Sequence, residues 1–411
     1  MIGIRRTSAL VVCVIGVAAC TAATPTRLVS ERASRAPTAP APTAPAPTAT
    51  ASPAPSPTGE FVLDLGNELT VWTITPEFTA TVLEHASTGA YVLLSAGPEE
   101  DAAPDLWAVT PGPSSEPELL WRNEQRDRSL VKLGGDLDTI LFVDMPVTGE
   151  VGWNLWLIPE DGADAILLDR HPGGADVPSL VPSFTAYQPR VAWTAFDAGP
   201  DGPVSQLLTA TAPDWEPQVV VERLASEAEL WFPSVYGNRL VYSEVRYSAD
   251  RTSDERHAYL IDLAVPGAEP LRLDASGLAT MPLINQFGII WKEADPGFNM
   301  LNWGVLFRYD PDSGQAERIG TGGQEYVNYP SIGERFAAWW GEDPLQLEVY
   351  DLELGRAREI VRYPASSGRG VVRPHVGSGL LVWRYHDGEG SAPEIRYAYL
   401  PVPGSNRLDP P

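Results

Sequence analysis

The chain has 411 residues, of which 44% are hydrophobic and 20% are charged, and it contains thirteen Trp and fourteen Tyr. This composition can bury a large core and excludes a chain that is disordered throughout. The formal net charge is -25, and residues 1–60 hold five Arg and two Glu, so the remainder carries -28. Because nucleic acids and anionic lipid surfaces are bound through Lys and Arg, this acidity argues against a nucleic-acid partner.

The first twenty residues have the layout of a signal peptide. Arg5 and Arg6 precede an apolar segment, residues 9–18, that is too short to span a bilayer. Val17-Ala18-Ala19-Cys20 resembles the bacterial lipobox, in which the cysteine receives diacylglycerol. The resemblance implies that residues 1–19 are a lipoprotein signal peptide and that Cys20 anchors the mature protein to a bacterial cell membrane, facing outside the cytoplasm. An ordinary signal peptide that contains a cysteine is the alternative.

Residues 20–60 are rich in Ala, Pro, Thr and Ser, and Ala-Pro-Thr recurs between residues 36 and 48. Such a segment has too few apolar side chains to pack a core. Proline at this density favours an extended polyproline II chain that rises about 3.1 Å per residue. We therefore expect a disordered, lipid-anchored linker that holds the folded part on the order of 100 Å from the membrane.

Residues 61–411 contain an internal repeat of about fifty residues. A proline followed by a short apolar segment recurs at Pro182, Pro233, Pro282, Pro330 and Pro374. In the last four copies a large aromatic residue stands nine positions after the proline, at Tyr242, Trp291, Trp339 and Trp383. A turn that contains glycine separates the two in most copies, which is typical of strand, tight turn and strand.

Each copy continues with two further β-rich segments, so it predicts a four-stranded antiparallel sheet. About seven copies, within a range of six to eight, predict an all-β fold, a β-propeller, over residues 61–411. The last copy lacks its outermost strand, which a segment within residues 61–83 would supply, closing the ring. An array of stacked β-sandwiches is the alternative, although its repeats are usually longer.

The sixth copy carries the clearest family resemblance. Pro330 to Trp339, followed by Val349-Tyr350-Asp351-Leu352, resembles the WD40-like repeat of TolB-type propellers. The resemblance extends over most of residues 89–401 and implies the propeller architecture more than a role.

No motif for catalysis or cofactor binding is present. The chain has no Gly-x-Ser-x-Gly elbow, no His-Glu-x-x-His spacing and no Gly-rich phosphate loop with Lys. Asp310-Pro311-Asp312-Ser313-Gly314 has alternating carboxylates that suit Ca²⁺, but its composition is that of a tight turn. The sequence therefore predicts no catalytic residue, no metal and no cofactor.

Acidic residues follow the second strand of several copies, where the loops of a propeller emerge on one face. They include Asp197, Glu244 and Glu389. Five others, together with His386, form the group that we call the acidic rim: Glu293, Asp295, Glu342, Asp343, His386 and Asp387. Trp291, Trp340 and Tyr385 stand beside them, so the rim suits a cationic group or a basic protein surface. Two other interpretations are simpler: the loops are polar because they are solvated, and the aromatic residues of the second strands belong to the core between blades.

Three functions remain open at this point. The first is a membrane-tethered, non-enzymatic propeller that binds a protein or a small molecule at the cell envelope. The second is an extracellular propeller enzyme, a glycosidase or lyase, that uses paired rim carboxylates such as Glu293 and Asp343. The third is a structural spacer of the envelope that binds no ligand.

Overall fold

The computed structural model describes residues 71–74, 82–97, 103–112, 116–125, 127–137, 139–147, 152–159, 164–173, 177–248, 254–294, 304–311, 313–320, 327–342, 345–363, 369–387 and 394–400. The predicted signal peptide, Cys20 and the linker at residues 20–60 lie outside this range. Among the described residues, no helix has the length and apolar character needed to cross a membrane.

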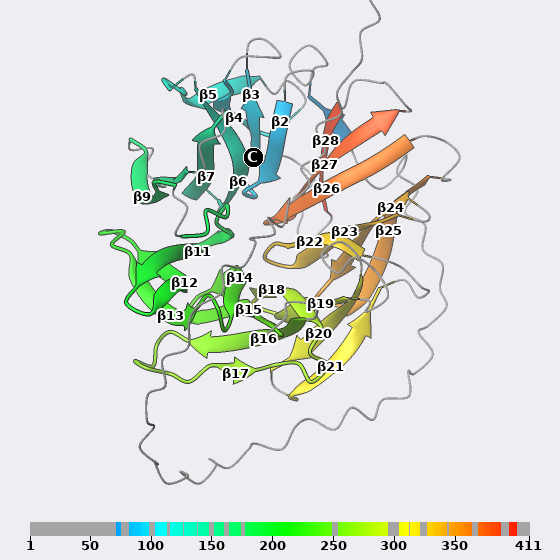
Figure 1. The fold of residues 1–411 in the computed structure, drawn as a ribbon. Coiled ribbons are helices and arrows are strands. Elements are labelled where there is room, and N and C mark those ends of the chain that lie inside the picture. The colour runs from blue at the N-terminus through cyan, green and yellow to red at the C-terminus, as the bar shows by residue number, and fades with distance from the viewer. Residues whose placement is uncertain are drawn as a thin grey trace, which may run out of the picture. The chain divides into compact units, whose positions relative to one another are not determined.

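The strands form seven four-stranded antiparallel sheets, which we call blades and number in chain order (Figure 1). Blade 1 consists of β2 (Val82–Ser87), β3 (Val92–Ala96), β4 (Asp105–Val109) and β5 (Pro117–Trp121). Blade 2 consists of β6 (Arg128–Asp136), β7 (Thr139–Pro146), β8 (Trp153–Ile158) and β9 (Ile166–His171). Blade 3 consists of β10 (Phe184–Tyr187), β11 (Arg190–Gly199), β12 (Gly202–Thr211) and β13 (Gln218–Leu224). Blade 4 consists of β14 (Glu229–Tyr236), β15 (Arg239–Tyr247), β16 (Asp254–Asp262) and β17 (Leu271–Arg272). Blade 5 consists of β18 (Ala279–Asn285), β19 (Gly288–Ala294), β20 (Gly304–Asp310) and β21 (Gln315–Ile319). Blade 6 consists of β22 (Val327–Ile332), β23 (Phe336–Glu342), β24 (Leu345–Asp351) and β25 (Arg356–Tyr363). Blade 7 consists of β26 (Arg369–Gly377), β27 (Leu380–Asp387), β28 (Glu394–Tyr399) and β1 (Val71–Thr73).

The blades surround a common centre, with the first strand of each blade innermost (Figure 1). Inner strands of successive blades contact one another, as β2 contacts β6, β14 contacts β18 and β22 contacts β26. Strand β26 also contacts β2, so blade 7 meets blade 1. The predicted propeller of about seven four-stranded blades is therefore confirmed, and the stacked β-sandwich alternative is wrong.

The ring closes through a strand from the beginning of the described chain. Strand β1 pairs antiparallel with β28, placing Val71 opposite Ala398 and Thr73 opposite Arg396. The indole of Trp72 stacks on the ring of Tyr397 with centroids 5.5 Å apart. The prediction that a segment within residues 61–83 completes the last blade is thus confirmed.

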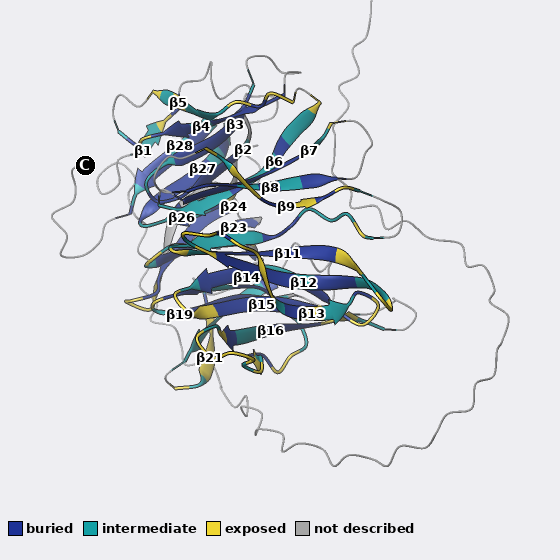
Figure 2. Ribbon diagram, turned by 90° about the vertical axis from the view of Figure 1, so that its left-hand side faces the viewer, coloured by how far each residue is buried: buried dark blue, intermediate teal, exposed yellow. Residues whose placement is uncertain are grey.

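Apolar side chains fill the interfaces between blades. Tyr242, Trp291, Trp339 and Trp383, the aromatic residues of the repeat, are at most 2% exposed. Trp383 of blade 7, for example, belongs to a cluster with Leu347 and Val349 of blade 6. These residues are inter-blade core, as the simpler interpretation predicts, and buried residues concentrate within the blades in Figure 2.

The repeated proline marks a β-bulge in the inner strand. Pairing with the second strand skips two residues in blades 4 to 7, at Phe232, Met281, Tyr329 and Arg373 and the proline after each. Each residue before the proline has a positive φ, between 43° and 52°. Such a backbone is unfavourable for a non-glycine residue, but its recurrence in four blades shows that the bulge belongs to the architecture and is not the mark of one site.

The serine after two of these prolines links neighbouring blades. The hydroxyl oxygen of Ser234 accepts a hydrogen bond from the backbone N–H of Ile284, 3.1 Å away in blade 5. Ser331 accepts one from the backbone N–H of Val376 in blade 7, at 2.9 Å. A small hydroxyl at this position therefore satisfies a backbone donor of the next inner strand, which explains the recurring Pro-Ser.

Candidate functional site

Two inner strands carry histidine at the position where blades 4 and 6 carry the linking serine. His85 in blade 1 and His375 in blade 7 each pair with the third residue of the second strand, the register position of Ser234 and Ser331. The two imidazole rings meet edge to face with their centroids 5.4 Å apart. Blades 1 and 7 thus replace a purely structural side chain with an ionisable one at the joint between them.

Charged side chains surround this histidine pair. We call the group the inner cationic cluster, and it comprises Glu84, His85, Lys132, Arg373, His375 and Arg384. Nη1 of Arg373 donates to both carboxylate oxygens of Glu84, at 2.7 and 2.8 Å. His85 Nε2 donates to the backbone carbonyl oxygen of Arg373 at 3.0 Å. These contacts tie the inner strand of blade 7 to that of blade 1.

Lys132 extends the cluster into blade 2. Its Nζ donates to the carbonyl oxygen of Pro182 at 3.1 Å and lies 5.0 Å from the ring centroid of Phe184. Arg384, on β27, presents a buried Nε that has no hydrogen-bond partner among the described residues. The side chain of Arg373 is 47% exposed, so solvent reaches the cluster.

The electrostatics of the cluster favour an added negative charge. Burial, and then the charges of Arg373 and Lys132, lower the pKa of His375 to about 4. Burial and the neighbouring His375 hold the pKa of His85 well below its usual value. Burial lowers the pKa of Lys132 to about 8, although Glu84 opposes this shift. Near neutral pH both histidines are therefore uncharged, and three cationic side chains face one carboxylate in a protein whose overall charge is strongly negative.

The described part of the acidic rim is less open than the sequence suggests. Glu293 lies on β19, and its carboxylate accepts a hydrogen bond from the indole N–H of Trp291 at 3.2 Å. Burial raises the pKa of Glu293. His386 lies on β27, where burial and then Arg384 lower its pKa. Glu342 and Asp387 end strands β23 and β27, whereas Asp295 and Asp343 lie outside the described residues.

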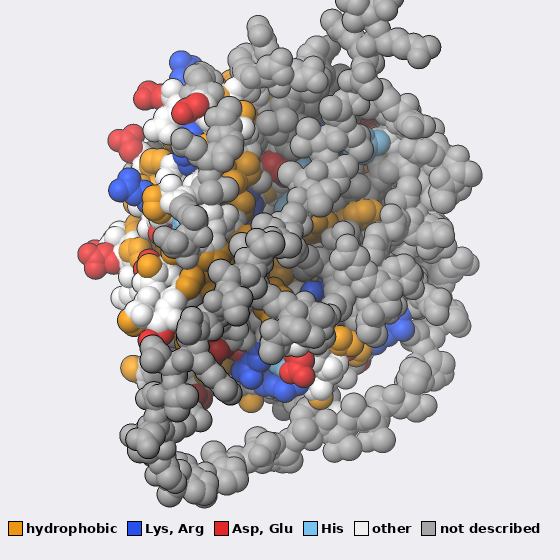
Figure 3. Space-filling view, in the orientation of Figure 1, with side chains coloured by type: hydrophobic (Ala, Val, Ile, Leu, Met, Phe, Trp, Pro, Cys, Tyr) orange, Lys and Arg blue, Asp and Glu red, His pale blue; other side chains and the backbone are white. Residues whose placement is uncertain are grey.

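The prediction that Glu244 lies in a solvent-exposed loop beside the acidic rim is wrong. Its side chain is fully buried and forms ion pairs with Arg223 at 3.1 Å and with Arg246 at 2.5 Å. A buried carboxylate held by two guanidinium groups is a structural element, because desolvation favours keeping its partners in place. Asp197, by contrast, is exposed on β11. On the described surface of Figure 3, both acidic and basic side chains lie along the left-hand margin.

Asp310 and the residues that follow it form a tight turn held by hydrogen bonds to Asp310. The hydroxyl of Ser313 donates to a carboxylate oxygen of Asp310 at 2.8 Å, and the backbone N–H of Gly314 donates to the Asp310 carbonyl at 2.9 Å. Within the described ranges, no group of three or more His, Cys, Asp or Glu side chains is arranged to hold a metal ion.

Sequence reasoning missed the inner cationic cluster. Its signal was the departure from the repeat: Arg373-Pro374-His375 stands where three other copies have an apolar or aromatic residue, proline and serine. Such a departure identifies one position, but it does not show that His85 and Lys132 from blades 1 and 2 lie beside it.

Comparison with known proteins shows the fold. No known family model matches the chain, and no curated protein matches its sequence. Among solved structures, the β-propeller domain of the Trilobed protease from Pyrococcus furiosus matches with a TM-score of 0.53 at 10% identity, covering 77% of this chain and 92% of that one. Acylaminoacyl peptidase from Pyrococcus horikoshii matches with a TM-score of 0.51 at 13% identity, covering 78% of this chain and 51% of that one.

TolB from Acinetobacter baumannii is also similar, with a TM-score of 0.40 at 12% identity, covering 72% of this chain and 77% of that one. At these identities the likeness concerns architecture alone, since a shared fold does not fix a function. The chain is therefore a seven-bladed β-propeller, and the likeness assigns it no site.

Proposed function

We propose that this protein is a lipid-anchored, extracytoplasmic binding protein, tethered at Cys20, whose propeller binds an anionic ligand at the inner cationic cluster. The observation that carries the proposal is the convergence of Lys132, Arg373 and Arg384 around a single carboxylate, Glu84, on a strongly acidic chain. An anion that reaches the cluster would accept charge-assisted hydrogen bonds, which are stronger than neutral ones.

Arg384 supports the proposal in a second way. A buried polar atom without a partner costs free energy, on the order of 1–3 kcal/mol. The Nε of Arg384 is such an atom among the described residues, and a carboxylate or phosphate oxygen beside it would remove that cost. Arg373 is half-exposed and already holds Glu84, so it would contribute its positive charge.

The proposal is non-enzymatic because the sequence offers no nucleophile elbow and no zinc motif. The paired-carboxylate alternative needs Glu293 and Asp343 about 5–9.5 Å apart. Burial raises the pKa of Glu293, as a general acid would need. Its carboxylate is nevertheless bound to Trp291 in its own blade, and its partner in this alternative, Asp343, lies outside the described residues.

Calorimetric titration of the full chain in detergent with citrate and with inorganic phosphate tests the proposal. We expect at least one of these anions to bind, and Arg384→Gln to weaken that binding by about tenfold or more, the loss of one charge-assisted contact. Arg170→Gln, which removes an exposed arginine from outer strand β9, is the matched control and should leave binding unchanged. Absence of binding by both anions, or equal binding by the Arg384 variant, would refute the proposal.

A further inference from the structure

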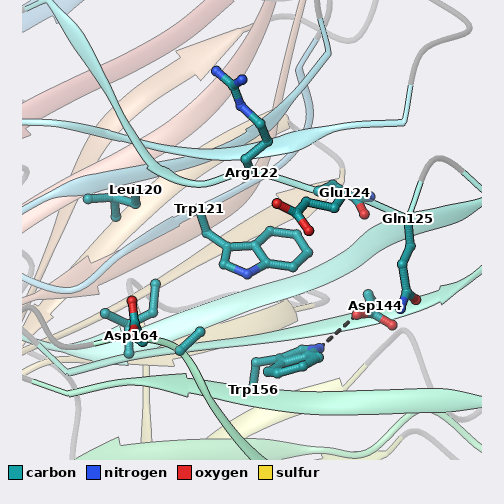
Figure 4. A pocket seen from close by; sticks show the side chains of 11 residues that line it. Leu120, Trp121, Arg122, Glu124, Gln125, Asp144, Trp156 and Asp164 are labelled. Atoms are coloured by element: carbon teal, nitrogen blue, oxygen red, sulfur yellow. Dashed lines mark hydrogen bonds between the residues drawn. The ribbon is translucent and has the colours of Figure 1, made fainter.

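A cleft lies between blades 1 and 2, and its lining residues are not those of the inner cationic cluster. The cleft has a volume of about 470 Å³ and is bounded by Trp121 at the end of β5, the segment that follows it, and Trp156 on β8. This volume falls within the range of about 300–1,000 Å³ that is usual for small-molecule sites. Figure 4 shows the two indoles one above the other, with polar side chains on both flanks.

The aromatic floor of the cleft is rigid. The ring of Trp121 packs against Phe142 with centroids 4.9 Å apart and lies 6.3 Å from the ring of Trp156. Trp156 Nε1 donates to Asp144 at 2.7 Å. Asp144 also accepts from Arg128 and Asn154. A carboxylate that already accepts three hydrogen bonds therefore fixes the indole of Trp156, and Asp144 itself has little capacity left for a ligand.

Three exposed polar side chains line the cleft. Glu124, Gln125 and Asp164 are exposed and line the cleft beside Trp121. In Figure 4, Glu124 and Gln125 lie to one side of the Trp121 ring and Asp164 to the other, while Arg122 extends away from both indoles. The combination is one half-buried indole flanked by hydrogen-bond acceptors and by an amide that both donates and accepts.

We infer that this cleft binds a neutral carbohydrate chain. A pyranose ring has an apolar face of C–H groups that packs on an indole face, whose quadrupole is negative, while its hydroxyls point sideways to acceptors and amides. Anionic sugars are disfavoured by the carboxylates of Glu124 and Asp164. A quaternary ammonium group would need several aromatic faces directed at one point, whereas Trp121 and Trp156 pack against Phe142 and leave no enclosed cage.

The inference does not depend on the inner cationic cluster, which lies on other strands and has the opposite charge preference. It adds a second ligand class to the protein: a neutral glycan held at the edge between two blades, such as one on a cell surface.

Tryptophan fluorescence and calorimetric titrations of the full chain in detergent test the inference with three probes: maltotetraose, cellotetraose and the tetrasaccharide of N-acetylglucosamine. We expect at least one tetrasaccharide to bind with a change in tryptophan emission. Trp121→Ala should weaken that binding by about tenfold or more. Gln125→Ala should weaken it as well and, because Gln125 is exposed, should fold normally even if the Trp121 variant does not.

Two controls keep the result specific. Trp107→Ala removes another half-buried tryptophan of blade 1, whose Nε1 donates to the Ala96 carbonyl, and should leave the affinity unchanged. Arg384→Gln should also leave it unchanged, which separates this site from the inner cationic cluster. Absence of binding by all three tetrasaccharides, or binding that survives both cleft substitutions, or an equal loss in the Trp107 variant, would overturn the inference.

Discussion

Arg373 and Glu84 form an ion pair across the joint at which the propeller closes, although they stand 289 positions apart in the chain. The guanidinium Nη1 lies 2.7 and 2.8 Å from the two carboxylate oxygens. The backbone of Arg373 also receives the Nε2–H of His85. Because both contacts join blade 7 to blade 1, the inner cationic cluster exists only when the ring is closed.

Lys132 predicts an alkaline limit to anion binding. Its pKa is about 8, so its positive charge is present below that pH and is lost above it. We expect the affinity for citrate or phosphate to fall as the pH rises from 7 to 9, measured by calorimetry. Lys132→Arg, which stays charged in this range, should abolish the fall. An affinity that does not change between these pH values would show that Lys132 takes no part in binding.

Lys292 predicts that the fold becomes more stable as the pH rises. Burial, and then the charge of Arg256, lower its pKa to about 7, below the value of about 10.4 expected in the unfolded chain. Between these values the unfolded state binds more protons, so the free energy of unfolding rises with pH. Denaturant titrations at pH 7, 8 and 9 should show this rise, and it should be smaller in Lys292→Met. An equal slope in both proteins would contradict the prediction.

The backbone at Gly377 passes so close to blade 1 that there is no room for a side chain at the joint between blades 7 and 1. A Cβ at this position would lie 2.7 Å from the backbone nitrogen of Gly89 and 2.8 Å from the carbonyl carbon of Thr88. Gly377→Ala should therefore destabilise the fold by about 1–3 kcal/mol in denaturant titrations. It should also weaken citrate binding, because it disturbs the joint that holds Arg373 beside Glu84.

Gly237→Ala is the comparison for this substitution. A Cβ there meets nothing within 4 Å, and only the positive φ of 56° is unfavourable. It should lower stability somewhat and leave citrate binding intact. If Gly377→Ala is as stable as the parent protein, the backbone approach described here is not a constraint.

Substitution of Trp72 measures how much the closing strand β1 contributes to stability. Its indole stacks on Tyr397 and meets Tyr399 edge to face at 6.2 Å. Trp72→Ala should cost about 2–4 kcal/mol of stability, less than for a fully buried tryptophan, and should increase proteolytic cleavage between β1 and β2. Leu271→Ala, on the exposed outer strand β17 of blade 4, should change neither. Unchanged proteolysis in the Trp72 variant would mean that strand pairing alone closes the ring.

Cys20 predicts membrane attachment in cells. Cys20→Ser should abolish incorporation of labelled palmitate and move the protein out of the membrane fraction, because no other covalent anchor is expected. Cys13→Ser, within the predicted signal peptide, should retain both properties. A Cys20 variant that stays in the membrane fraction would favour an ordinary signal peptide and a different mode of attachment.

The repeat made the fold predictable, while the position of the site depended on the packing of particular side chains. The spacing of proline and aromatic residues predicted the first two strands of each blade, and the two β-rich segments after them predicted the others. The structure confirms the ring and the closing strand. Glu244 shows the limit of this reasoning. It follows the same pattern as the other predicted rim acids but is buried between Arg223 and Arg246, and linear position does not show which face of a strand meets the next blade.

The sequence alone predicts a β-propeller of about seven blades, because each blade repeats one short pattern of prolines, turns and buried aromatic residues. Only the tertiary structure brings together the residues of the two proposed binding sites. The ring brings His85 and Lys132 beside Arg373 from the other end of the chain, and two successive blades form the Trp121 cleft. Both sites depend on contacts between blades, and contacts between residues far apart in sequence leave no periodic signal in the chain.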